Sequence, residues 1–362
     1  MKRQLIKITP VGEMFFRDTM NMTMGESNWI ISNRIPSLSV FYGALTSMQL
    51  REGKFVDVLE LIKEANKEKD KDIRNKKQQE IDQLLKSKIK IHGIYLADET
   101  NLYIPTPLDL FLDEDHRIKL GEDKEDGIYI PEEEYYNDDE EWHMAENTFI
   151  SLKDYMRYRK NEGIKNIRVK QYEEFFDYYH KVGISRKEDR TIEEGKLYFT
   201  DMVSFKNKEM GYVLQVECED FEVPEEGKLI QLGGERKTAI VKNYSNRQWK
   251  RLEEKNQLIE GKDKVKLIFT ASFVLAEGKE EIFEKSQITI LNSAIGKLDY
   301  VGGYNMAISS QKEIRKAIPA GSVFILDISK CQEEALYSYI RKNINIGEND
   351  KKFISFLLQD VN

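Results

Sequence analysis

A pair of adjacent glycines followed by two charged residues is the stretch of this chain best suited to contact a ligand. Gly233-Gly234-Glu235-Arg236 lies between two apolar runs that are typical of strands, Leu229-Ile230 and Ala239-Ile240-Val241. Adjacent glycines permit positive φ angles and let a ligand approach the backbone closely. Arginine adds a forked hydrogen-bond donor and glutamate an acceptor. On these residues alone, the pattern favours a plain glycine hairpin with two solvated charges.

Other stretches pair basic or glycine residues with aromatic ones, as single-stranded RNA sites do. Backbone clamping and base stacking need such combinations. The combinations are Phe15-Phe16-Arg17, the basic run that contains Arg186 and Arg190, and Gly302-Gly303-Tyr304. Each is common on protein surfaces, so only their joint occurrence favours an RNA partner.

Residue patterns for catalysis are absent from the sequence. The histidines, His92, His116, His143 and His180, form no metal-ligand pair. No phosphate-binding loop with Gly-Lys-Ser/Thr occurs, and no dinucleotide fingerprint follows the first strand. Two cysteines without metal-site spacing fit a reducing compartment. We therefore expect a cytoplasmic protein that is not an enzyme and has no metal or cofactor.

The net charge of −8 is concentrated in one acidic stretch. Residues 113–146 contain 15 Asp and Glu against three Lys and Arg, so the remainder of the chain carries +4. Local patches govern binding more than the total charge does, and an RNA partner is therefore compatible with this composition. No apolar run reaches the roughly 18 residues of a membrane-spanning helix, and we expect no membrane partner.

Apolar periodicity predicts an α+β fold. Strands are predicted over residues 4–9, 89–96, 102–104, 196–205, 211–218, 265–273, 322–328 and 353–358. The strands 196–205 and 211–218 are expected to form a hairpin. Helices are predicted after Ile35-Pro36-Ser37, over 152–160, across Tyr172, Phe175, Phe176 and Tyr179, and over 247–258 and 331–342.

The order of these elements predicts two ferredoxin-like (RRM-like) domains with insertions. The first covers residues 1–219 and the second residues 220–362. Residues 63–90 are expected to form a long, solvated helical insertion, and residues 113–146 an acidic surface loop.

In order and spacing, the motifs resemble the third-subunit family of type III-B CRISPR Cmr complexes, in the RAMP superfamily. The resemblance spans nearly the whole chain, from about residue 8 to residue 358. It rests on residues 15–18, 35–45, 103–109, 182–198, 232–236, 301–304 and 319–323. The sequence departs from the family at Tyr304, where tryptophan is common, and at Gly347, which is what remains of a glycine-rich loop.

The resemblance implies a non-catalytic subunit that binds the 5′ tag of the guide RNA in antiviral defence. It also implies that the subunit bridges the large palm-domain subunit and the first backbone RAMP subunit. The tag contacts it implies are Arg17, Ser37, Gly233, Gly234 and Arg236, with Arg186 and Arg190 as secondary candidates. Arginines would fork onto phosphates or base edges, and the glycines would present N–H groups to phosphate oxygens.

Two other functions remain open at this point. A metal-independent RAMP endoribonuclease that matures guide RNA would need a general base near the 2′-hydroxyl, for which His92 and His180 are the candidates. A purely protein-bridging module would need none of the RNA contacts.

Overall fold

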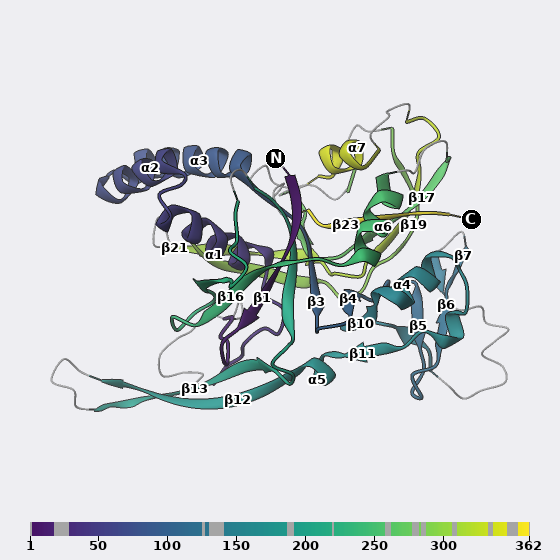
Figure 1. Ribbon diagram of the computed structural model, residues 1–362, viewed down its shortest axis with the longest axis horizontal. Coiled ribbons are helices and arrows are strands. Elements are labelled where there is room, and N and C mark those ends of the chain that lie inside the picture. Colours follow the sequence, from purple (N-terminus) through teal and green to yellow (C-terminus); the bar gives the residue numbers. More distant parts are fainter. Residues whose placement is uncertain are drawn as a thin grey trace.

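A large antiparallel sheet forms the centre of the structure, a computed structural model (Figure 1). The structure describes residues 2–17, 29–124, 127–129, 141–186, 192–218, 221–257, 262–276, 282–283, 287–305, 310–331, 336–345 and 354–361. In spatial order the eight strands of this sheet are β11 (Val169–Gln171), β10 (Thr148–Ser151), β4 (Leu102–Pro105), β3 (Ile89–Ala97), β14 (Gly211–Cys218), β1 (Lys2–Pro10), β16 (Thr238–Tyr244) and β15 (Lys228–Gln231).

Both faces of the central strand β14 are apolar, and this fixes its place inside the sheet. Tyr212 and Leu214 point into one core cluster, and Val213 points into another. The predicted hairpin between residues 196–205 and 211–218 is therefore wrong, although both strands exist. β14 pairs with β1 and β3, and β13 (Ile192–Phe205) joins a separate sheet. A strand buried on both faces needs neighbours that are themselves covered.

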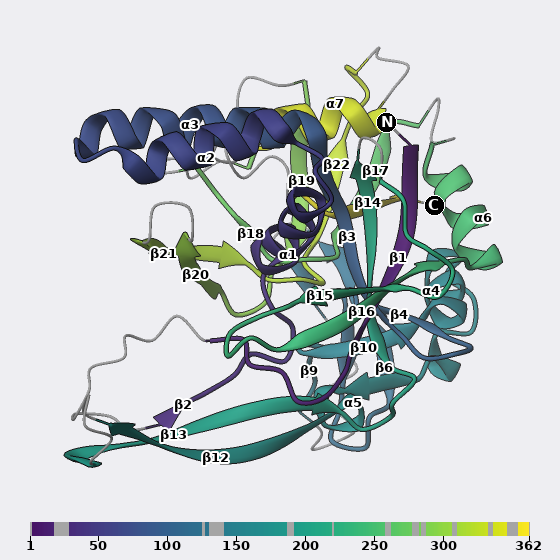
Figure 2. The same ribbon diagram turned by 60° about the vertical axis from the view of Figure 1, so that its left-hand side comes forward.

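The separate sheet is a long ribbon. β13 pairs antiparallel with β12 (Phe176–Arg186) and parallel with the short β2 (Trp29–Ile30). Figures 1 and 2 show β12 and β13 projecting together from the body of the molecule. The helix predicted across Tyr172 to Tyr179 is wrong beyond Phe175, because α5 (Tyr172–Phe175) ends where the β12 ladder begins. Aromatic residues favour strands as readily as helices when a partner strand is present.

Helices cover one face of the large sheet. α1 (Leu38–Arg51) packs on β3 and β15, and its predicted apolar stripe is buried at Leu38, Phe41, Leu45 and Met48. The helical insertion is confirmed as helical but consists of two helices, α2 (Val56–Lys67) and α3 (Lys71–Lys88), that lie side by side (Figure 2). The break occurs because the Asp70 side chain accepts hydrogen bonds from the amides of Asp72 and Ile73 and starts a new helix.

The opposite face packs against other helices and a second sheet. α4 (Leu152–Arg159) begins at Ser151, whose hydroxyl accepts from the Asp154 amide as the capping pattern predicts. α6 (Arg247–Gln257) buries Trp249 beside Tyr95 of the large sheet. The second sheet has the order β19 (Thr289–Ala294), β22 (Val323–Asp327), β17 (Lys264–Phe269) and β23 (Phe356–Asp360).

The remaining elements are short. α7 (Leu336–Asn343) lies near the second sheet, and a 3₁₀ turn covers Ile164–Asn166. A three-stranded sheet has the order β18 (Phe273–Val274), β21 (Ser310–Ile318) and β20 (Asp299–Asn305). The acidic stretch, expected as loop, contains β6 (Ile118–Leu120), β7 (Glu122–Lys124), β8 (Gly127–Tyr129) and β9 (His143–Met144), of which β6 and β9 flank β5 (Leu110–Leu112). Residues 130–140 of that stretch lie outside the described residues.

The α+β class is confirmed. The large sheet takes strands from both sides of the expected boundary at residue 219, since β15 and β16 continue it beyond β14. The division into two ferredoxin-like domains stays a prediction. Within the described residues, no helix is long and apolar enough to cross a membrane.

A buried polar cluster joins α4 to the second sheet. The Asp109 carboxylate accepts hydrogen bonds from the Tyr158 hydroxyl at 2.9 Å and from Lys266 Nζ at 2.6 Å, and only 1% of the Asp109 surface is exposed. The Lys266 ammonium also lies 5.1 Å from the centre of the Tyr158 ring. Burial, and then the Asp109 charge, raises the pKa of Tyr158, so its hydroxyl stays a donor.

Replacement of Lys266 by methionine should lower the free energy of unfolding by about 3–5 kcal/mol, because it leaves a buried carboxylate without its cation. The matched control is Lys264→Met on the same strand, where the side chain is exposed and the expected change is within about 0.5 kcal/mol. Urea unfolding of both variants measures the difference. Equal stability of the two would show that the Asp109 cluster contributes nothing.

Candidate nucleic-acid interface

The glycine loop is a tight connection between β15 and β16. The Leu232 amide donates to the Lys237 carbonyl at 2.9 Å, and the Lys237 amide donates to the Gly234 carbonyl at 3.2 Å. Three loop residues have left-handed φ angles: 77° at Gly233, 55° at Glu235 and 54° at Arg236. Such angles are costly for residues with a Cβ, so packing around the loop has to hold Glu235 and Arg236 in place.

The segment after β1 provides that packing. The Gly234 amide donates to the Phe15 carbonyl at 2.8 Å. A Cβ atom at Gly233 would lie 2.5 Å from the Phe15 carbonyl oxygen, and one at Gly234 would lie 2.8 Å from the Phe15 ring. Both glycines are therefore required by close packing. The expectation that the Gly234 N–H faces a phosphate is wrong, since that donor is used within the protein.

Residues 14–16 are held on several sides, and we call them the clamp segment. Met14 exchanges two backbone hydrogen bonds with Val203 of β13, of 2.7 and 2.9 Å. The Phe16 amide donates to Ser32 Oγ at 2.8 Å, and the Phe16 carbonyl accepts from the Asn33 amide at 2.8 Å. Arg17, the next residue, forms an isolated antiparallel β-bridge with the backbone of Ser32. The clamp segment thus joins the glycine loop to the ribbon.

Two predicted contacts lie in the segments that this junction joins. Arg17 follows the clamp segment directly, Arg236 belongs to the loop that packs on Phe15, and both side chains are exposed. Lys181 and Lys237 each lie 3.3 Å from the same Glu13 carboxylate. Their hydrogen bonds hold the pKa of Glu13 below its usual value. Because two cations share one anion, this trio adds one positive charge beside the arginines.

The other predicted contacts are placed differently. Ser37 is half-buried at the start of α1, and its hydroxyl is bonded to Ser39 Oγ at 2.8 Å without capping the helix. Arg186 ends β12, ten residues beyond Phe176 at the base of the ribbon and therefore roughly 30 Å away from it. It does not join the loop. Arg190 and Gly347 lie outside the described residues.

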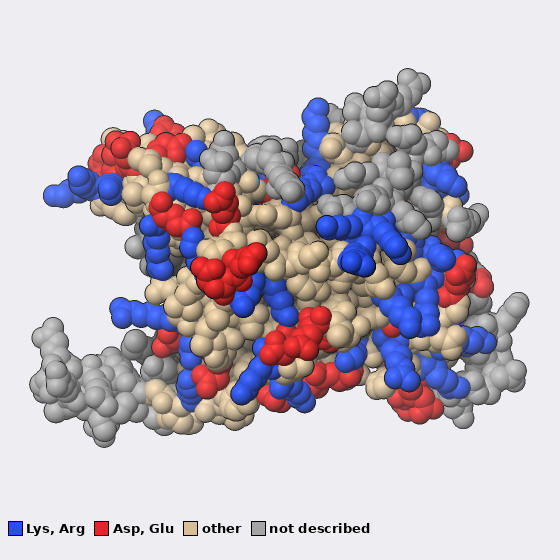
Figure 3. All heavy atoms as spheres, viewed as in Figure 1, with Lys and Arg blue, Asp and Glu red and all other residues tan. Residues whose placement is uncertain are grey.

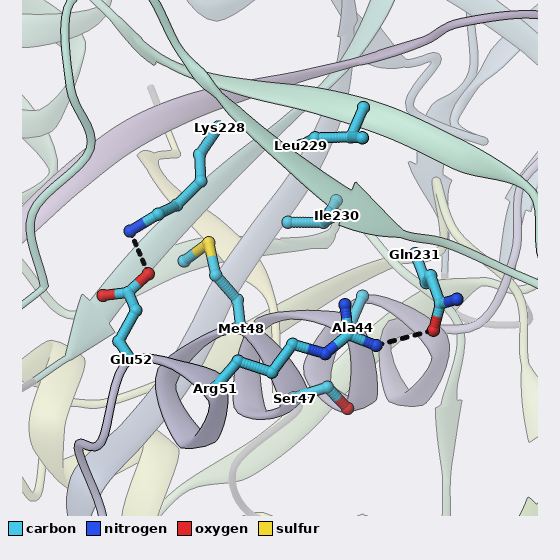
Figure 4. Close-up of a pocket in the computed structure, with 9 residues that line it drawn as sticks. All are labelled: Ala44, Ser47, Met48, Arg51, Glu52, Lys228, Leu229, Ile230 and Gln231. Atoms are coloured by element: carbon cyan, nitrogen blue, oxygen red, sulfur yellow. Dashed lines mark hydrogen bonds and ion pairs between the residues drawn. The ribbon is translucent and has the colours of Figure 1, made fainter.

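A shallow groove runs between α1 and β15, next to the loop (Figure 4). Two polar pairs close its ends. Arg51 donates to Gln231 Oε1 at 2.7 Å, and Lys228 pairs with Glu52. Its floor includes Met48 and Ile230. Since its polar side chains are bonded to each other, the groove offers few groups to a ligand.

The two candidate bases of a nuclease differ sharply. His92 is 2% exposed, and burial, aided by nearby arginines, lowers its pKa to about 2. Its Nε2 lies 3.0 Å from the Glu217 carboxylate, so the neutral ring donates there. His180 is exposed, and its Nδ1 lies 2.6 Å from Asp201 Oδ1. In the described part of the chain, no three His, Cys, Asp or Glu side chains gather closely enough to hold a metal ion.

Two groups of residues were not predicted from the sequence. Trp29 donates its indole N–H to Asp201 at 2.9 Å, beside His180. The signal for this group in the sequence was a tryptophan that follows Phe15-Phe16-Arg17 closely along the chain. Lysine and arginine side chains also gather over α4 and α6 (Figure 3), where Lys153, Arg247, Lys250 and Arg251 are exposed. Their helical spacing in α6, opposite Trp249 and Leu252, marks a solvated basic face.

Comparison with known proteins agrees with the motif order. The chain matches the family described as CRISPR-associated protein (Cas_Cmr3) over residues 6–350. It is similar to a chain in the cryo-EM structure of the type III-B Cmr-beta bound to cognate target RNA, with a TM-score of 0.51 and 15% identity over 98% of both chains. The structure with target RNA and AMPPnP, state 1, gives a TM-score of 0.50 and 17% identity over 98% of this chain and 94% of that chain.

At these identities the solved structures show a shared fold, and no curated protein matches the chain. The family match covers nearly the entire chain and confirms the resemblance drawn from the motifs. The protein belongs to the CRISPR-associated Cmr3 family.

Proposed function

We propose that this protein holds the 5′ tag of the guide RNA at the junction of the clamp segment and the glycine loop. Its family membership makes it a subunit of a type III-B CRISPR effector complex. The observation that supports tag binding is the packing of Phe15 on Gly233 and Gly234. This packing joins the segments that carry Arg17 and Arg236, which are far apart in sequence and are both exposed.

The chemistry of that surface suits a phosphate backbone. Two exposed guanidinium groups supply forked donors, and the trio of Lys181, Lys237 and Glu13 adds positive charge. Packing on Phe15 holds the loop, with Glu235 and Arg236 in left-handed conformations, so little entropy is lost when RNA binds. Gly233 is exposed, so its backbone is accessible to the RNA beside the two arginines. Ser37, Arg186 and Arg190 are secondary contacts in this proposal.

We further propose a cytoplasmic, non-catalytic bridging role between the large palm-domain subunit and the first backbone RAMP subunit. The similar chains come from Cmr-beta complexes bound to target RNA, which supports an RNA-bound multisubunit setting for this chain as well. The basic face of α4 and α6 belongs to other elements than the glycine loop. In this proposal it is a separate surface that a protein partner could contact.

Loss of both arginines at the junction should weaken guide binding. In the assembled complex, Arg17→Ala with Arg236→Ala should reduce affinity for tagged guide on the order of 10- to 100-fold, as expected for two charge-assisted contacts. The slope of the logarithm of the binding constant against the logarithm of the salt concentration should become smaller in magnitude by about 1.4. Nuclease protection of the tag and binding at several salt concentrations measure these effects.

The matched control removes two positive charges elsewhere: Lys63→Ala with Lys67→Ala on the exposed face of α2. Unchanged tag protection in the junction variant, or an equal loss in the control, would refute a tag site at this loop. Guide-free assembly that is insensitive to salt would instead support the purely protein-bridging alternative.

The exposed His180 held by Asp201 favours the endoribonuclease alternative. Its imidazole is bonded to a carboxylate through Nδ1, its Nε2 has no hydrogen-bond partner among the described residues, and such a ring has the form of a general base. Our proposal predicts no specific cleavage of precursor RNA by the purified protein in EDTA. Cleavage that disappears in His180→Ala and persists in His92→Ala would establish the nuclease and overturn the non-catalytic role.

A further inference from the structure

An exposed tryptophan lies beside an exposed histidine on one face of the ribbon, and one buried carboxylate holds both. Asp201 Oδ2 accepts from Trp29 Nε1 at 2.9 Å, and Asp201 Oδ1 accepts from His180 Nδ1 at 2.6 Å. The Asp201 side chain is only 12% exposed, whereas 52% of Trp29 and 61% of the His180 side chain are accessible. Two large rings are thus fixed in place and still face solvent.

Strand register explains how the rings meet. His180 lies directly opposite Asp201, and Trp29 lies opposite Phe199, so all four side chains share one face of the sheet. The indole stacks on Phe199, with ring centres 5.6 Å apart and planes at 22°. His180 meets the indole at 5.2 Å and 72°. Tyr179, one residue along the strand, points to the opposite face.

About half of the Trp29 surface, 52%, is exposed, and Phe199 stacks on one side of the indole. The indole N–H lies in the ring plane, so the carboxylate that it binds lies beyond the edge of the indole. A flat ligand therefore has access to exposed aromatic surface, with the His180 ring beside it as a hydrogen-bonding group.

We propose that Trp29 and His180 form a platform on which one unpaired base of single-stranded RNA stacks. The inference rests on the proposed RNA-binding function and adds a second kind of contact to it. Asp201 excludes a phosphate as the ligand of the platform, because its negative charge lies at the rim, whereas a neutral base has a π-face that suits indole. Preordered rings bind with little loss of conformational entropy.

The platform is close to the proposed backbone contact. Arg17 forms its bridge with Ser32, three residues after Trp29, which corresponds to roughly 10 Å of extended chain. On the same face of β12, the Arg34 guanidinium lies over the rings of Tyr172 and Tyr178, at 5.2 and 5.0 Å. In this proposal an arginine for phosphate, an indole for a base and a stacked guanidinium, the last ion-paired with Glu173, come from neighbouring segments of the chain.

Photocrosslinking in the assembled complex tests the platform. Guide RNA carrying 5-iodouridine at one position at a time should give a Trp29 adduct from a single position. Trp29→Ala should weaken guide binding roughly 5- to 150-fold, the range for one stacked base, and Trp29→Phe should stay within about threefold because it retains the stacking surface. The matched control Tyr179→Ala removes an aromatic ring, 49% exposed, from the opposite face and should leave binding unchanged.

Guide affinity of Trp29→Ala equal to that of the unaltered protein would overturn the platform. Release of a protein subunit by Trp29→Ala at unchanged guide affinity would assign the rings to a protein partner and would overturn it equally. The proposed tag site is tested separately. If Trp29→Ala loses guide affinity while the Arg17→Ala, Arg236→Ala variant keeps full tag protection, the tag site at the glycine loop is refuted. The platform would then bind another part of the guide.

Discussion

The backbone of the clamp segment is the constraint on which the functional surface depends. Met14, Phe15 and Phe16 hydrogen-bond to β13, to the glycine loop and to the residues after β2, so three distant parts of the chain converge on three residues. Buried backbone donors and acceptors need partners, and here each partner belongs to a different element. The large sheet, through β1 and the β15–β16 loop, is thereby joined to the ribbon that carries Trp29 and His180.

Local patterns were sufficient where a local interaction decides the structure. The helical spacing of Leu38, Phe41 and Leu45 predicted α1, and the spacing from Ser151 to Asp154 predicted the start of α4. Pairing partners were harder to predict. β13 and β14 are separated by a short turn, as in a hairpin, but the two apolar faces of β14 select β1 and β3, which lie more than a hundred residues away in sequence. The strand propensity of a segment contains no information on which distant strand it pairs with.

The candidate site shows the same limit. The glycine pair was recognised, but as a bare cradle for phosphate, because no sequence pattern indicates that Phe15 occupies the space above Gly233. Trp29 lay outside every periodic segment, and its partners Phe199 and Asp201 are about 170 residues further along the chain. A parallel pairing that spans only two residues is too short to produce a detectable alternation of polar and apolar residues in the sequence. Sequence thus identifies residues with suitable chemistry, and packing decides which of them meet.

An acidic chain can carry an RNA-binding surface because local patches of charge govern binding more than the net charge does. In the described part of the chain, some lysines on the helical insertion and at the groove pair with carboxylates: Lys77 with Glu64, Lys88 with Asp57 and Lys228 with Glu52. Such exposed pairs contribute little stability but cancel charge locally. In the proposed arrangement the junction needs only a few uncommitted cations, because stacking on an indole does not depend on net charge. Phosphate contacts then fix position, and ring contacts supply affinity that salt does not screen.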